Sequence, residues 1–75
     1  KMEVYTDLPG MQLYGGNYIN EGLVGKGGCT YGKRYGVAFE TQYFPNAINL
    51  PSFPQPVEKA GETVKTSTVY KFTTV

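Results

Sequence analysis

The chain has 75 residues, 40% hydrophobic and 15% aromatic, with seven basic and six acidic side chains and a formal net charge of +1. That length allows one domain at most, or a segment of one, and the basic residues are too scattered to indicate a nucleic acid partner. With Cys29 as the only cysteine and no histidine, an internal disulfide, the usual zinc sites and histidine-based nucleophilic triads are excluded.

Two strands are predicted near the N-terminus. Apolar and polar side chains alternate over 2–7, which is typical of a half-buried strand. Leu-Pro-Gly at 8–10 indicates a turn. An extended segment follows over 11–14, with Gln12 and Tyr14 on one face, and two glycines end it.

The glycine-rich stretch over 20–32, NEGLVGKGGCTYG, has no periodicity and predicts a long loop. Its GLVGKGG resembles a phosphate-binding loop, but Gly27 stands where that pattern needs serine or threonine. No histidine is available to activate Cys29, so we interpret this cysteine as an incidental reduced thiol rather than a nucleophile.

The strongest strand is predicted over 35–44. One of its faces carries Gly36, Ala38, Glu40 and Gln42. Small side chains beside a carboxylate and an amide leave room for a ligand, so this face is the one that indicates a binding site.

The next segment is rich in proline, since four of the five prolines lie within 45–56. Proline cannot donate to a strand ladder, so we predict an ordered, extended surface segment there. A turn at 60–62 leads to a final strand over 63–75. The fold class is all-β with about four strands. These do not complete a sandwich, so 1–75 is predicted to be one segment, part of a β-sandwich.

Glu40 is the first candidate for chemistry, because it lies in mid-strand beside apolar neighbours while the other acids lie in turns or on polar faces. Partial burial would make it a better base near neutral pH. The alternative is an edge carboxylate paired with a lysine or arginine. Gln12 is the second candidate: its amide could bind sugar hydroxyls, or it could be an ordinary exposed side chain.

The sequence also bears on the cellular location of the protein. A single cysteine favours a reducing, cytoplasmic location over secretion. No run approaches the roughly 18 apolar residues of a membrane span, so no membrane partner is expected. The N-terminus lacks a signal-peptide pattern. The chain begins with Lys1 and enters strand-like sequence at once, which we interpret as a segment of a longer protein.

Four motifs, in this order, resemble the C-terminal end of aldose 1-epimerases (galactose mutarotases). They are VYTDLPGMQLYGGN, GKGG, GVAFETQYFPNAINLPSFP and GETVKTSTVYKF, and the resemblance extends from Met2 to Phe72. It implies a large β-sandwich, the galactose mutarotase-like supersandwich, with an open sugar-binding cleft. The chain would be its C-terminal part.

The resemblance also implies roles for both candidates. It makes Glu40, in the Glu-Thr-Gln motif, the general base, and Gln12, in the Pro-Gly-x-Gln motif, a contact of the hexose substrate. Interconversion of anomers needs a base for the C1 hydroxyl and an acid for the ring oxygen, with no metal or cofactor. The acid in that family is a histidine, so the remainder of an epimerase chain would supply it, and the 75 residues alone are expected to be inactive.

This sequence departs from the family pattern at three places. Asn46 stands where the family usually has an aspartate. Tyr43 precedes Phe-Pro, where a histidine or an aromatic is common. The family's Tyr-Thr/Ser-Gly-Asn appears here as Tyr-Gly-Gly-Asn at 14–17. None of them touches Glu40 or Gln12. Two other functions remain open: a non-catalytic carbohydrate-binding or structural β module of the same fold, and a sugar-modifying relative with another reaction.

Overall fold

The computed structural model describes residues 1–75 and contains no α-helix, which confirms the all-β class. It has six short strands and two single turns of 3-10 helix. Their bounds are β1 (Met2–Thr6), β2 (Gly10–Tyr14), β3 (Leu23–Val24), η1 (Lys26–Gly28), β4 (Thr30–Tyr31), β5 (Ala38–Gln42), η2 (Ala47–Asn49) and β6 (Thr68–Phe72). No helix is long and apolar enough to cross a membrane.

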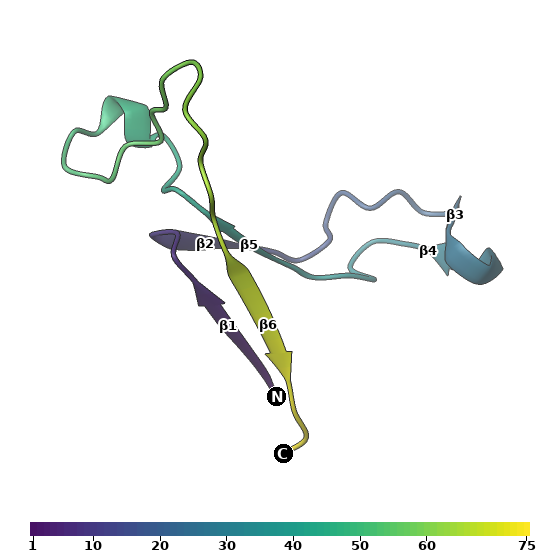
Figure 1. Cartoon of the computed structure of the whole chain (residues 1–75). Coiled ribbons are helices and arrows are strands. Elements are labelled where there is room, and N and C mark those ends of the chain that lie inside the picture. Colours follow the sequence, from purple (N-terminus) through teal and green to yellow (C-terminus); the bar gives the residue numbers. More distant parts are fainter.

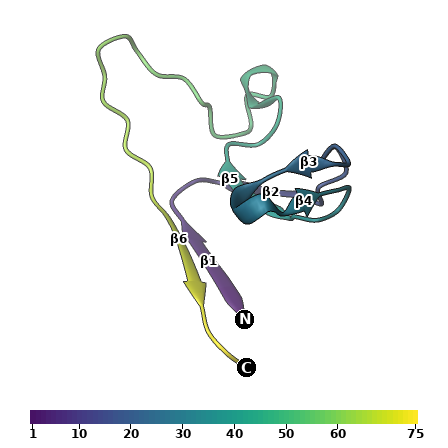
Figure 2. The ribbon, with the colours of Figure 1, turned by 90° about the vertical axis from the view of Figure 1, so that its right-hand side faces the viewer.

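The strands form three separate antiparallel pairs, β1–β6, β2–β5 and β3–β4. Pairing of the first strand with the last brings the two termini to the same end of the molecule (Figure 1). There the terminal amino group of Lys1 donates a 2.7 Å hydrogen bond to the Thr73 carbonyl. The β3–β4 arm projects away from the other two pairs (Figures 1 and 2).

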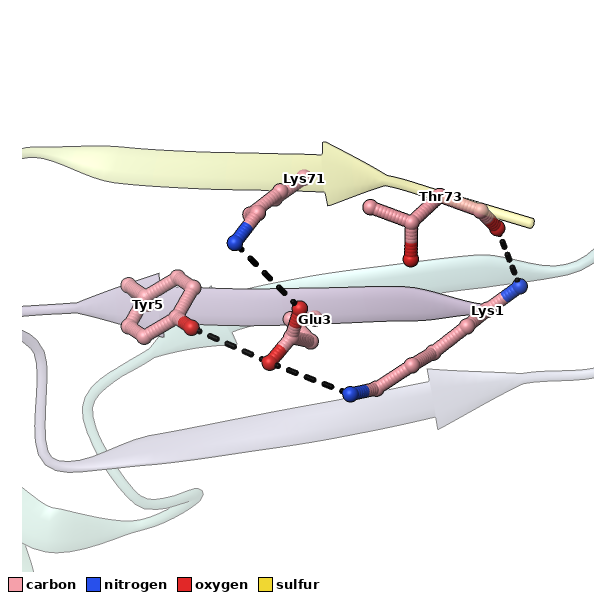
Figure 3. Close-up of polar contacts among 5 residues, drawn as sticks. All are labelled: Lys1, Glu3, Tyr5, Lys71 and Thr73. Atoms are coloured by element: carbon pink, nitrogen blue, oxygen red, sulfur yellow. Dashed lines mark hydrogen bonds and ion pairs between the residues drawn. The ribbon is translucent and has the colours of Figure 1, made fainter. Parts of the chain in front are cut away.

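The register of β1–β6 places Glu3 directly opposite Lys71. Figure 3 shows three side chains converging on the Glu3 carboxylate. Lys1 and Lys71 place their Nζ atoms 3.5 and 3.7 Å from it, and the Tyr5 hydroxyl donates over 3.2 Å. Because both lysines are more than half exposed, each ion pair contributes about 0–1 kcal/mol. The cluster favours this register more than it stabilises the fold.

Two side-chain hydrogen bonds join β6 to β5. The hydroxyls of Thr41 and Thr68 lie 2.6 Å apart, and the Tyr70 hydroxyl donates to the Phe39 carbonyl over 2.5 Å. Side chains alternate between the two faces of a strand, so the β5 face that carries Thr41 is opposite the face that carries Glu40. The Glu40 face is therefore turned away from the β1–β6 pair.

The chain has almost no core of its own. Only Gly16, Gly32 and Ala47 are buried. The accessible surface is 6263 Å², against roughly 4,600 Å² for a compact protein of this mass. The radius of gyration is 16.6 Å, against about 11 Å. Such an open arrangement of paired strands agrees with a part of a β-sandwich rather than with a closed one.

The long predicted strands are shorter in the structure. Of 35–44, only Ala38–Gln42 is a strand, because its partner β2 has five residues. Of 63–75, only Thr68–Phe72 is a strand, because it pairs with the five residues of β1. A ladder ends where its partner ends, whatever the strand propensity of the residues beyond it.

The loop predicted over 20–32 is wrong in detail, because it contains β3, η1 and β4. Two-residue strands are too short to show any periodicity. The turn between them uses Gly27 and Gly28, whose φ angles of +69° and +77° favour glycine. The proline-rich 45–56 forms no strand, as predicted, although it folds into the η2 turn rather than staying extended.

Candidate functional site

The structure brings the two predicted site residues together. In the β2–β5 register Gln12 lies directly opposite Glu40. Directly opposed residues project from the same face, with Cβ atoms about 4.5–5.5 Å apart. An amide and a carboxylate that are far apart in sequence thus become neighbours on one surface.

The face around this pair is small and polar. The β2 strand contributes Gly10, Gln12 and Tyr14 to it, and the register sets Gln42 opposite the glycine and Ala38 opposite the tyrosine. The register therefore agrees with the two faces expected from the alternation of side chains along each strand. Alanine adds little bulk at one end of the face, while at the other end the Phe44 ring occupies the space over Gly10.

Glu40 is exposed in this chain, so the expected partial burial is absent here. Both ion pairs of the chain involve Glu3, so within these 75 residues Glu40 has no lysine or arginine partner. Gln12 is also exposed, and its Nε2 makes one long bond of 3.2 Å to the Leu13 carbonyl. Both groups are therefore free to bind hydroxyls.

An aromatic pair borders one end of the face. The rings of Tyr14 and Tyr18 stack with centroids 6.5 Å apart and an interplanar angle of 6°. The Tyr14 hydroxyl accepts a 2.9 Å hydrogen bond from the backbone N–H of Tyr18. This bond ties the turn after β2 to the end of the face.

A second aromatic pair borders the other end. The Phe44 ring covers Gly10 so closely that an added Cβ there would lie 2.8 Å from its Cε1 atom. Phe44 in turn packs on Phe53, with centroids 5.0 Å apart. The proline-rich segment therefore contacts this end of the face through Phe53.

Gln55 holds the proline-rich segment in its folded shape. Its Nε2 lies 2.7 Å from the Ala47 carbonyl and 3.0 Å from the carbonyls of Leu50 and Phe53. One amide thus replaces ladder hydrogen bonds that the prolines cannot make. Sequence reasoning missed Gln55 and Phe53, because only the folded loop brings them to their partners.

The face measures about 13 Å from Gly10 to Tyr14, four residues at the rise of a strand. The 75 residues enclose no pocket, so the face is open. No group of three or more His, Cys, Asp or Glu side chains gathers anywhere in the chain.

These features define a segment of an all-β protein with one open face, polar at its centre and aromatic at both ends. The sequence model of the aldose 1-epimerase family matches residues 1–71. The chain belongs to the aldose 1-epimerase family.

Curated relatives agree with this assignment. Galactose mutarotase of Mus musculus is 42% identical over 71 residues, and that of Homo sapiens is 44% identical, each match covering 95% of this chain. Aldose 1-epimerase of Escherichia coli (strain K12) is 34% identical over 74 residues, 96% of this chain. The chain spans 21% of the length of each of these relatives. No solved structure matches it significantly.

Proposed function

We propose that residues 1–75 are the C-terminal segment of a complete aldose 1-epimerase, which interconverts the α and β anomers of a hexose such as galactose or glucose. The observation that carries the proposal is the register that sets Gln12 opposite Glu40 on an open face. Membership of the family and the 34–45% identity to named epimerases and mutarotases support it. The proposed location is the cytoplasm.

In this mechanism Glu40 is the general base. Its carboxylate takes the proton of the C1 hydroxyl while an acid protonates the ring oxygen, so the C1–ring oxygen bond breaks and an open aldehyde forms. Rotation about the C1–C2 bond and reversal of both proton transfers close the ring on either face. The acid is a histidine from the remainder of the epimerase chain, since these 75 residues contain none.

Gln12 orients the sugar beside the base. Its amide donates and accepts hydrogen bonds, and its position directly opposite Glu40 supports a contact with hydroxyls close to C1. The aromatic pairs at both ends limit where the ring can lie along the face. The sugar is then bound and loses its proton at the same place on the β2–β5 pair.

Polarimetry of the complete protein tests the proposal. Freshly dissolved α-D-galactose and α-D-glucose should reach their equilibrium rotation faster with the protein than in buffer. A denatured mass spectrum of the same sample establishes that the 75 residues are joined to a larger, histidine-containing chain. Hexose binding without any rate increase would instead indicate the non-catalytic carbohydrate-binding module. A rate increase for neither sugar would contradict the proposal.

Gln12→Ala should lower kcat/KM for the preferred hexose about tenfold, mainly through KM, because one or two hydrogen bonds to the sugar are lost. Initial rates over a range of sugar concentrations measure it. Asn20→Ala is the matched control, since this exposed amide lies outside the face. Equal kinetics in the two variants would remove Gln12 from the site.

A further inference from the structure

We propose that Tyr70 and Thr68 of β6 are positioning residues for Glu40. This inference rests on the proposed role of Glu40 as general base. It adds two side chains, from a strand outside the β2–β5 pair, that hold the residues on either side of the base, one through a backbone carbonyl and one through a side-chain hydroxyl, without touching the sugar.

The contacts lie on both sides of Glu40. Its preceding neighbour, Phe39, accepts the 2.5 Å hydrogen bond from the Tyr70 hydroxyl. Its following neighbour, Thr41, shares the 2.6 Å hydroxyl–hydroxyl bond with Thr68. The two β6 residues are two positions apart, so they lie on the same face of that strand. Figure 1 shows the start of β6 lying across β5.

These bonds act from the side opposite the substrate. Alternation along β5 sends the Thr41 side chain to the face opposite Glu40. A bond made by Thr41 therefore cannot lie on the Gln12–Glu40 face. The effect of the β6 hydroxyls on a bound sugar must consequently pass through the position of Glu40.

Glu40 needs such support because little else fixes it. Its side chain is exposed and has no ion-pair partner. In this chain β5 has one ladder neighbour, β2, and isolated two-stranded pairs are only marginally stable. A catalytic group must stay within about 0.5 Å of its productive position. Two short hydrogen bonds to the residues flanking the base supply that constraint.

The test uses Tyr70→Phe and Thr68→Val in the complete protein, each of which removes one hydroxyl and keeps the side-chain volume. We expect kcat to fall about tenfold in each, with KM unchanged within about twofold, because the base is displaced while sugar binding is retained. Thr68→Ser keeps the hydroxyl and should restore kcat.

Matched controls come from the rest of the chain. Tyr5→Phe removes a tyrosine hydroxyl bonded to Glu3 on the other face of β1–β6. Thr30→Val makes the same change as Thr68→Val in the distant β4 strand. Both should keep wild-type kcat and KM. In a Glu40→Gln background, Tyr70→Phe should leave the residual rate unchanged, since it acts through the base.

Glu40→Gln measured in parallel separates the two proposals. If it abolishes turnover while Tyr70→Phe and Thr68→Val keep wild-type kcat, the positioning role is wrong and the proposed function stands. If Glu40→Gln keeps the wild-type rate, Glu40 is not the base and the positioning role fails with it, while the polarimetric rate of the wild-type protein still decides whether it is an epimerase. A rise in KM at constant kcat would also overturn the positioning role. Should Tyr70→Phe fail to fold, the Thr68→Val and Thr68→Ser pair decides alone.

Discussion

Glu40→Gln in the complete protein is expected to lower kcat for anomer interconversion by about 100- to 10,000-fold, the usual contribution of general acid–base catalysis. Glutamine keeps the length and the hydrogen-bonding shape of glutamate but cannot take the proton of the C1 hydroxyl. Polarimetry at saturating hexose measures the loss. KM should change little, because the amide can still bind a hydroxyl.

The fold should not be affected by this substitution. Glu40 is exposed and takes part in neither ion pair of the chain, so the free energy of unfolding should change by less than about 0.5 kcal/mol. Glu58→Gln is the matched control, an exposed glutamate two residues beyond the proline-rich segment. A Glu40→Gln enzyme as fast as the Glu58→Gln enzyme would show that another group is the base.

The sequence predicted the strands well where local pattern decides, and less well where pairing decides. Alternation over 2–7 corresponds closely to β1 (Met2–Thr6). Over 35–44 the same alternation continues past the true ends of β5, since nothing local marks where β2 stops. Strand length in this chain is a property of the pair, and a single sequence shows one member at a time.

The candidate site was also predicted only in part from the sequence. Residue type and face identified Gln12 and Glu40 as candidates, but only the register shows that they are directly opposite each other. A shift of one residue would send one of them to the other face. Thr68 and Tyr70 lie on a predictable face of β6, yet their partners belong to a different pair of strands. The crossing of the two pairs was not predictable from local pattern.

The apolar residues left uncovered agree with the proposed place of the chain in a larger protein. Tyr35 and Phe72 are 73% and 74% exposed, although full burial of such side chains is worth about 1.5–3 kcal/mol each. In a complete sandwich these faces would pack on further strands. The remainder of the protein would then enclose the open face around Glu40 and would also supply the histidine that the proposed mechanism uses as the acid.

Gly16→Ala is expected to destabilise the complete protein by about 2 kcal/mol or more. Gly16 is buried and has a φ angle of +70°, a conformation that alanine adopts only under strain. An added Cβ would lie 2.5 Å from the Gly36 carbonyl oxygen, which is backbone and cannot rotate away. Relief requires separating the turn after β2 from the segment before β5. Urea or thermal unfolding measures the loss.

The neighbouring glycine provides the control, because a Cβ at Gly15 would meet nothing within 4 Å. Gly15→Ala should be neutral or stabilising by up to about 1 kcal/mol. The Gly16 carbonyl accepts the N–H of Arg34 over 2.9 Å and that of Ile19 over 3.3 Å. Displacing it would also move the turn that carries Tyr18, so kcat/KM should fall together with stability. Equal stability of the two alanine variants would mean that this close approach does not constrain the fold.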